Sequence, residues 1–182
     1  MFEPNLPNLL TIFRILLVPV MVVVLLSEVF ESDWPAAAVF AIASLTDVAD
    51  GYLARRNDQV STFGKLWDPL ADKLLVTAAL ISLVSLERLD AWVAMVIISR
   101  EFTVTGLRQI AVEQGRVIAA STAGKIKTFM QVAMVLVLII VDDRGLAVDL
   151  LVYATVAVTV GSGAGYFIRL RSDEQTKARD GA

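Results

Sequence analysis

Apolar residues dominate six stretches of the chain, and each stretch is bounded by polar or turn-forming residues. A helix of about 20 mostly apolar residues, rising about 1.5 Å per residue, crosses the hydrocarbon core of a bilayer. The pattern therefore predicts six transmembrane helices with polar ends, roughly at residues 9–26, 34–54, 66–86, 91–107, 126–141 and 145–168. The first stretch contains Arg14 and lacks a following small-residue cleavage site, so we expect a retained helix and not a signal peptide.

Two shorter segments flank these stretches. Residues 4–10 form a short amphipathic approach that we expect to lie in the membrane interface. Residues 172–182 form a polar tail, which we expect to be cytoplasmic and polar enough to be disordered. The chain is thus predicted to be an all-α integral membrane protein, with one membrane domain over residues 1–171.

Basic residues are distributed unevenly between the two sides of the predicted bundle. An even number of spans places both termini on one side, and that side with its adjoining helix ends holds 14 of the 16 Lys and Arg residues. Only Arg88 and Arg144 remain for the other side. The positive-inside rule then predicts a multi-pass protein of the cell membrane with both termini in the cytoplasm.

Ionisable residues enter the predicted helices mainly from their cytoplasmic ends. Such groups are costly at membrane depth unless they face water or a protein-lined interior. The pattern predicts a polar cavity that opens to the cytoplasm. The residues concerned are Arg14, Asp47, Asp50, Asp68, Asp72, Arg100 and Glu101.

Composition narrows the chemistry. Hydrophobic residues make up 57% and charged residues 19%, whereas soluble domains average about 45–50% and about 25%. The chain has no Cys and no His, which excludes thiolate zinc sites, thiol nucleophiles and imidazole bases. Acid–base or metal chemistry must therefore use carboxylates, which prefer hard cations. The net charge of −3 argues against nucleic acid as a partner.

Four aspartates form the most informative constellation. Asp47 and Asp50 are three residues apart and Asp68 and Asp72 are four apart, so each pair shares one helix face. The two predicted helices meet on the cytoplasmic side, which brings the pairs to one depth. Converging carboxylates repel one another, and two divalent cations, Mg²⁺ or Mn²⁺, would relieve this and bind substrate phosphate. The alternative is a set of capping and salt-bridged acids.

Small and basic residues between the aspartates favour the same interpretation. Gly51, Ala54 and Gly64 leave space for a ligand close to the backbone. The guanidinium of Arg55 has the fork of donors that suits a phosphate. The stretch therefore indicates a site that handles phosphate.

These residues resemble a known signature. The order Asp47, two residues, Asp50-Gly51, two residues, Ala54-Arg55, eight residues, Gly64, three residues, Asp68, three residues, Asp72 matches that of the CDP-alcohol phosphatidyltransferases without a departure. The resemblance implies a six-helix membrane domain, usually a homodimer, that transfers a phosphatidyl group from a CDP-linked lipid to an alcohol and releases CMP.

The resemblance also implies roles for these positions. Asp47, Asp50 and Asp68 would ligate the metals, with Asp72 close enough to contribute. Asp72 would be the general base that takes the proton of the attacking hydroxyl. The CDP moiety would contact Asp50, Gly51, Ala54, Arg55 and Gly64.

Outside the signature, four segments resemble the phosphatidylglycerophosphate synthases of this family: Pro7-Asn8-Leu9-Leu10-Thr11 with Arg14, Ser99-Arg100-Glu101, Gly106-Leu107-Arg108 and Gly124-Lys125-Ile126-Lys127-Thr128. The implied substrates are CDP-diacylglycerol and glycerol 3-phosphate. A dianionic phosphate calls for a second cationic cluster, with candidates Arg14, Arg100, Arg108, Lys125 and Lys127. The alternative is that these side chains snorkel at helix ends. For Glu101 we expect that it only neutralises a neighbouring Arg.

Other interpretations stay open at this point. Phosphatidylglycerol, giving cardiolipin, or inositol phosphate is an alternative acceptor. A divalent-cation transporter would also carry buried carboxylates, although here they gather at one end and no inverted repeat is visible. A membrane scaffold without activity is a third. The run Gly161-Ser162-Gly163-Ala164-Gly165 predicts close helix packing, within the chain in preference to a dimer seam.

Overall fold

The computed structural model describes the backbone of residues 6–27, 30, 32–57, 62–113 and 122–180, and the side chains of residues 9–27, 30, 32–46, 71, 73–112 and 124–165. Six helices and no strand occur in this part of the chain, so the all-α class is confirmed. The helices are α1 (Leu6–Leu26), α2 (Trp34–Asn57), α3 (Thr62–Ser85), α4 (Ala91–Glu113), α5 (Thr122–Ile140) and α6 (Leu146–Asp180).

Every predicted apolar stretch lies within one of these helices, with at most one residue outside it, and several helices are longer than the stretch. The helix α1 begins at Leu6, inside the expected interfacial segment, and α4 continues to Glu113. The helix α6 continues to Asp180, so the expected disorder of residues 172–180 is wrong. Five of these nine residues, one each of Glu, Gln, Lys, Ala and Arg, are good helix formers and can prolong a helix beyond its apolar part.

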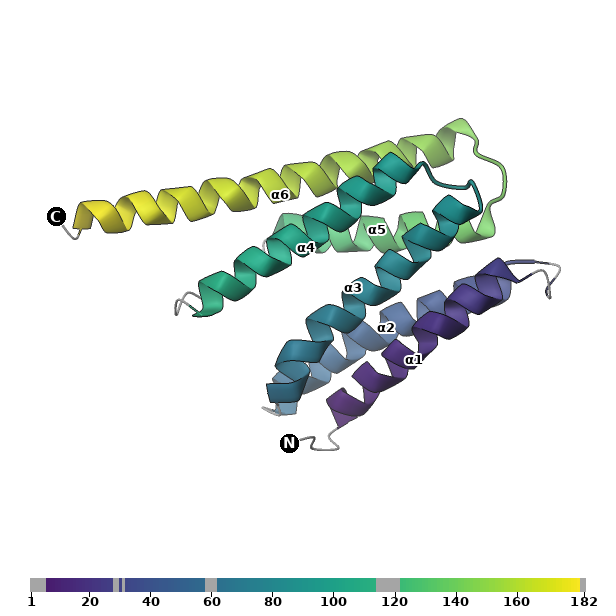
Figure 1. Cartoon of the computed structure of the whole chain (residues 1–182), viewed down its shortest axis with the longest axis horizontal. Helices are drawn as coiled ribbons and strands as arrows, with labels where there is room; N and C mark the ends of the chain where they lie inside the picture. The colour runs from purple at the N-terminus through teal and green to yellow at the C-terminus, as the bar shows by residue number, and fades with distance from the viewer. Residues whose placement is uncertain (1–5, 28–29, 31, 58–61, 114–121, 181–182) are drawn as a thin grey trace.

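The helices alternate in direction along the bundle (Figure 1). The helix α1 packs along α2 and α3, while α6 packs against α4 and α5. Contacts of α3 with α4 and of α2 and α3 with α5 join these two groups. The end of α2 and the start of α3 therefore lie at one end of the bundle, together with the start of α1 (Figure 1).

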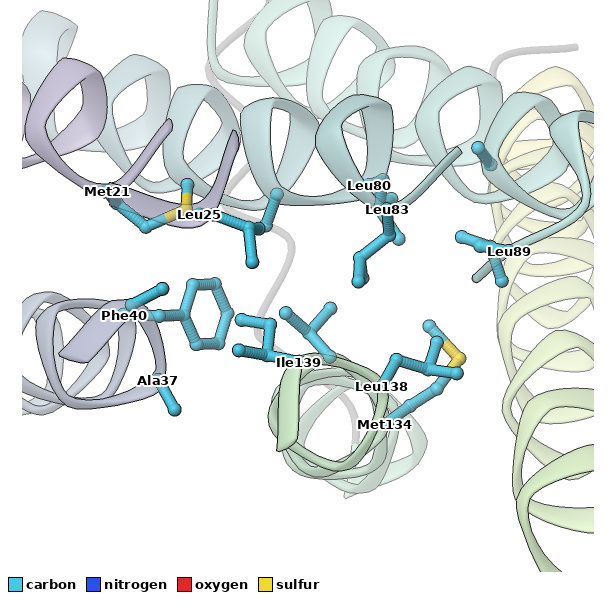
Figure 2. Close-up of a cluster of buried hydrophobic side chains, with 14 of the residues drawn as sticks. Met21, Leu25, Ala37, Phe40, Leu80, Leu83, Leu89, Met134, Leu138 and Ile139 are labelled. Atoms are coloured by element: carbon cyan, nitrogen blue, oxygen red, sulfur yellow. The ribbon is translucent and has the colours of Figure 1, made fainter. Parts of the chain in front are cut away.

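A buried apolar cluster joins the two groups of helices. Met21 and Leu25 of α1, Phe40 of α2, and Leu138 and Ile139 of α5 belong to it. Figure 2 shows the ring of Phe40 between the α1 side chains and Ile139. Between helices that lipid surrounds, close van der Waals packing of side chains is what favours association, so this cluster fixes the packing of α1, α2 and α5.

The outer surface of α1 is strongly apolar. Leu9, Phe13, Leu16, Val20 and Val23, spaced three or four residues apart, are all exposed. A continuous apolar surface of this kind marks contact with lipid or with another apolar partner. Two segments in the described residues are long and apolar enough to cross a membrane, Leu9–Leu26 and Leu146–Gly165. The apolar parts of α2 and α3, Trp34–Thr46 and Lys73–Ser85, are shorter. The six-span topology therefore stays a prediction.

The end of the bundle opposite the aspartates is held by Arg88. After α3, Glu87 adopts a left-handed backbone conformation (φ 60°), and the Arg88 amide donates to the Leu83 carbonyl oxygen at 2.9 Å. This is the bond pattern with which helices commonly end. It places Arg88 where its Nη1 donates to Asp33 Oδ2 at 2.6 Å and to the Ile139 carbonyl at 3.0 Å. Its Nη2 pairs with Asp142.

Arg144 ties the same end together in a second place. Its Nη2 lies 3.2 Å from Asp90 Oδ2 and 3.0 Å from Asp149 Oδ1. The hydrogen bond with Asp90 raises the pKa of the Arg144 guanidinium, and Asp149 adds to the effect. Both arginines that the sequence places on the outer side are thus paired with carboxylates there.

Candidate active site

The first aspartate pair lies in the last turns of α2. Ala36, Phe40 and Ala43 are fully buried and define the inner face of this helix. Continuing the same alternation of four and three residues leads to the backbone positions of Asp47 and Asp50. Gly51, Ala54 and Arg55 follow in the same helix. The side chains of these five residues lie outside the described part of the structure, so the register is what places them.

The second aspartate pair lies in the first turns of α3. Leu75, Ala79 and Ser82 are buried and define the inner face of this helix. Stepping back from Leu75 by three and then four residues leads to the backbone positions of Asp72 and Asp68. Gly64 lies in the first turn of the same helix. Side chains in this stretch are again outside the described residues.

An arginine of α1 is buried beside these two helices. Arg14 and Thr11 are fully buried, and α1 packs on both α2 and α3. Arg14 is eight residues, about 12 Å, from the start of α1. Asp50 and Asp68 are seven and six residues, about 10 Å, from the ends of their own helices. A buried guanidinium is stable only with compensating polar or acidic groups around it, so its burial here favours a polar interior at this end.

The donor chemistry at these positions suits a divalent cation. Carboxylate oxygens are the ligands that Mg²⁺ and Mn²⁺ prefer, and the two register positions bring two carboxylates from each helix to one end of the bundle. Among the side chains that the structure describes, no three acidic residues gather to hold a metal. The four aspartates fall outside that set, so they remain the candidates.

A separate charged cluster lies between α4 and α5. Glu101 Oε1 accepts from Lys127 Nζ at 2.5 Å and from Arg100 Nη1 at 3.2 Å. Lys127 is buried, and Arg100 and Glu101 are largely so. The expected pairing of Glu101 with a neighbouring Arg is present, and Lys127 is a second partner of the same carboxylate. Because one carboxylate serves two cations, the cluster keeps a net charge of +1.

The helix α6 contributes a residue to this cluster that sequence reasoning missed. Arg100 Nη2 lies 2.9 Å from Ser162 Oγ, which in turn donates to the Thr159 carbonyl oxygen at 2.9 Å. Arg100 and Ser162 are 62 positions apart in the chain. The only hint in the sequence is the run of small residues around Ser162, which predicts close packing but names no partner.

The hydrogen bonds given above for this cluster involve two of the five acceptor candidates, Arg100 and Lys127. Arg108 of α4 and Lys125 of α5 are exposed, and Arg14 lies in the other group of helices. The structure therefore joins Arg100 and Lys127 through Glu101. It does not show all five basic residues in one cluster.

Comparison with known proteins gives a family match over most of the chain. The family model described as CDP-alcohol phosphatidyltransferase matches residues 4–161. The match covers α1 to α5 and most of the apolar part of α6, and it includes every candidate site residue.

Three relatives illustrate the similarity. The CDP-diacylglycerol--glycerol-3-phosphate 3-phosphatidyltransferase of Bacillus subtilis is 44% identical over 180 residues, covering 90% of this chain and 93% of that protein. The protein of the same name from Rickettsia felis is 33% identical over 172 residues, covering 91% and 94%. A probable phosphatidylglycerophosphate synthase of Mycobacterium tuberculosis is 38% identical over 174 residues, covering 93% and 83%.

Proposed function

This chain belongs to the CDP-alcohol phosphatidyltransferase family, and from this premise we propose that it makes phosphatidylglycerophosphate. It transfers the phosphatidyl group of CDP-diacylglycerol to sn-glycerol 3-phosphate and releases CMP. Relatives named for this reaction match nearly the whole chain. The similarity therefore extends to the basic segments of α4 and α5 that we assign to the acceptor.

The observation that carries the proposal is the register of α2 and α3. The buried face of α2 that begins at Ala36 and the buried face of α3 that ends at Ser82 both continue onto aspartate positions. Two helices thus supply the complete signature from one end of the bundle. A transporter would instead need carboxylates along a path through the midplane.

Enzymes of this family depend on a divalent metal. Here we assign two ions, Mg²⁺ or Mn²⁺, to Asp47, Asp50, Asp68 and Asp72. When bound, such ions neutralise the pyrophosphate and stabilise charge that develops on the leaving group. The four aspartates would hold them through carboxylate oxygens, the ligands left to a chain that has no His or Cys.

The chain's own residues bind CDP-diacylglycerol and move one proton. Asp50, Gly51, Ala54, Arg55 and Gly64 hold the CDP moiety, since the small residues admit the ligand and Arg55 pairs with phosphate. Asp72 accepts the proton of the 1-hydroxyl of glycerol 3-phosphate. That oxygen bonds to the phosphorus that bears diacylglycerol, the bond from this phosphorus to the CMP oxygen breaks, and CMP leaves.

Basic residues of α1, α4 and α5 receive the acceptor. A dianionic phosphate is held best by several charged donors. We assign this role to Arg14, Arg100, Arg108, Lys125 and Lys127. Arg100 and Lys127 support the assignment because they are buried near each other with a net positive charge.

The same assignment sets the membrane context. We infer a multi-pass protein of the cytoplasmic membrane, with the site opening to the cytoplasm and both termini on that side. Pairing of Arg88 and Arg144 with carboxylates at the other end supports this orientation, because no unpaired basic side chain is left there among the described residues. We also propose a homodimer, as is usual in the family.

The decisive experiment varies the acceptor. Purified protein with CDP-diacylglycerol and Mg²⁺ is expected to release CMP with glycerol 3-phosphate, and at background rate with phosphatidylglycerol or inositol phosphate. CMP release that depends on one of the other two acceptors would reassign the substrate. No release with any acceptor, together with cation uptake into vesicles, would support the transporter instead.

Metal removal tests the cofactor. Chelation with EDTA is expected to abolish CMP release, because four converging carboxylates lose their counter-charge. Addition of excess Mg²⁺ or Mn²⁺ should restore the rate, and the better of the two identifies the preferred ion. Turnover that survives complete chelation would contradict the metal assignment.

A further inference from the structure

The Arg100 guanidinium is held from two sides by residues of different helices. Its Nη1 lies 3.2 Å from Glu101 Oε1, and its Nη2 lies 2.9 Å from Ser162 Oγ of α6. Its Nε is buried and has no hydrogen-bond partner among the described residues. A buried N–H donor without a partner is costly, so the guanidinium keeps one donor that an anionic oxygen would satisfy.

The backbone of α6 comes unusually close to this side chain at Gly163. A Cβ added to Gly163 would lie 3.3 Å from Arg100 Cγ and 3.6 Å from Arg100 Nε. The first of these contacts is tighter than ordinary van der Waals distance, so Arg100 would have to shift. A Cβ added to Gly161 or Gly165, in contrast, would have nothing within 4 Å. Only one of these three glycines of α6 makes room for the arginine.

The hydroxyl of Ser162 is itself oriented. It donates to the Thr159 carbonyl oxygen at 2.9 Å, and this leaves its lone pairs for Arg100 Nη2. The contact therefore fixes both the position and the direction of the guanidinium. Through Glu101 the same network extends to Lys127 of α5.

We propose that Ser162 and Gly163 of α6 are positioning residues that seat Arg100 for the acceptor phosphate. This inference rests on the proposed function, which assigns Arg100 to that phosphate. Ser162 acts through the hydrogen bond to Nη2, and Gly163 acts by leaving the space that Cγ and Nε occupy. The sixth helix thus takes part in acceptor recognition without touching the acceptor.

The test compares variants that differ only within one short stretch of α6. Ser162→Ala is expected to raise KM for glycerol 3-phosphate about 10-fold, the effect of losing one hydrogen bond to a charged group. Gly163→Ala is expected to raise it to a similar extent, because the added methyl group displaces Arg100 from the same contact. KM for CDP-diacylglycerol should not change. Gly161→Ala and Gly165→Ala add the same methyl group with the same gain in helix propensity, and both should match the wild type. Ser162→Thr, which keeps the hydroxyl, should restore most of the affinity.

Two results would overturn the proposed positioning role of Ser162 and Gly163. One is a KM for glycerol 3-phosphate that stays at the wild-type value in both Ser162→Ala and Gly163→Ala. The other is an equal rise in KM for both substrates with a fall in thermal midpoint, since this indicates a general packing defect.

A second readout separates this inference from the proposed function. A wild type that releases no CMP with glycerol 3-phosphate contradicts the proposed function. Thermal stabilisation of the protein by inorganic phosphate alone then still tests whether Ser162 and Gly163 position Arg100. The thermal midpoint should rise with phosphate in the wild type and in Gly161→Ala, and clearly less in Ser162→Ala and Gly163→Ala. Equal rises of the thermal midpoint in all four proteins would overturn the positioning role.

Discussion

At the scale of single residues, Asp72 has the most specific assignment. We expect Asp72→Asn to lower the rate of CMP release by at least about 10²-fold, because an amide cannot take the proton of the acceptor hydroxyl. The thermal midpoint and metal binding should change little, since the amide oxygen keeps the shape and one donor atom. The measurement is CMP release under saturating substrates, beside a melting curve in detergent.

The matched control for this change is Asp143→Asn. Asp143 is exposed in the segment between α5 and α6, at the other end of the bundle. The substitution removes the same charge far from the site, so its turnover should equal that of the wild type. Wild-type turnover in Asp72→Asn would show that another group takes the proton.

The core offers a second test at this scale. Phe40 is fully buried between α1 and α5, whereas Leu45 of the same helix is 68% exposed. We expect Phe40→Ala to cost about 3 kcal/mol of stability, because it leaves a cavity that its neighbours cannot fill. Leu45→Ala should cost well under half of that. Thermal or denaturant unfolding in detergent micelles measures both, and equal losses would contradict the packing described here.

Individual residues also show where sequence reasoning stops. The spacing within each aspartate pair is readable from the sequence, because residues three or four apart share one helix face. The contact between Arg100 and Ser162 is not, since it depends on how two distant helices pack. Burial of Lys127 is likewise a result of packing, and its position at a helix end suggested snorkelling equally well.

At the scale of elements, Arg88 fastens three connections. It joins the segment before α2 through Asp33, the end of α5 through the Ile139 carbonyl, and the segment before α6 through Asp142. We expect Arg88→Gln to lower the free energy of unfolding by about 1–3 kcal/mol, the range for losing hydrogen bonds to charged groups. The free energy of unfolding of Arg88→Lys should lie between those of the wild type and Arg88→Gln, because one ammonium keeps the charge but cannot replace the two-armed guanidinium.

The same variants should not change the kinetics of CMP release. Arg88 belongs to the segment between α3 and α4, which lies at the end of the bundle opposite the end of α2 and the start of α3 (Figure 1). KM for both substrates should therefore stay at the wild-type value below the melting temperature. Melting curves with and without the substitution measure the first effect and CMP release the second. A stability loss in Arg88→Lys as large as that in Arg88→Gln would assign the whole effect to geometry and none to charge.

The positions of the helices follow from the sequence more closely than their ends do. Hydropathy marks where a segment is apolar enough for lipid, and all six stretches prove helical. It does not mark where the backbone stops being helical, as the extension of α4 to Glu113 and of α6 to Asp180 demonstrates. The backbone bonds of a helix are internal, so polar residues with good helix propensity prolong it.

At the scale of the whole molecule, the orientation in the membrane can be tested directly because the chain has no Cys. A single introduced cysteine then shows, by its labelling, on which side of the membrane it lies. We expect Asp143→Cys to react with a membrane-impermeant maleimide in intact cells, because Asp143 is exposed at the end that we place outside. Gln114→Cys, directly after the last residue of α4, should react only after the membrane is permeabilised.

The predicted orientation follows from the distribution of charge between the two ends of the bundle. The outer arginines are paired with Asp33, Asp142, Asp90 and Asp149, so that end offers no excess of positive charge to retain it in the cytoplasm. Each cysteine variant must still release CMP, which ensures that the labelled protein is folded. If Gln114→Cys reacts in intact cells and Asp143→Cys does not, the orientation in the membrane is the reverse of the one we propose. Because the aspartate positions lie at the end of the bundle where α4 finishes, it would also move the active site away from the cytoplasm, where CMP and glycerol 3-phosphate must exchange.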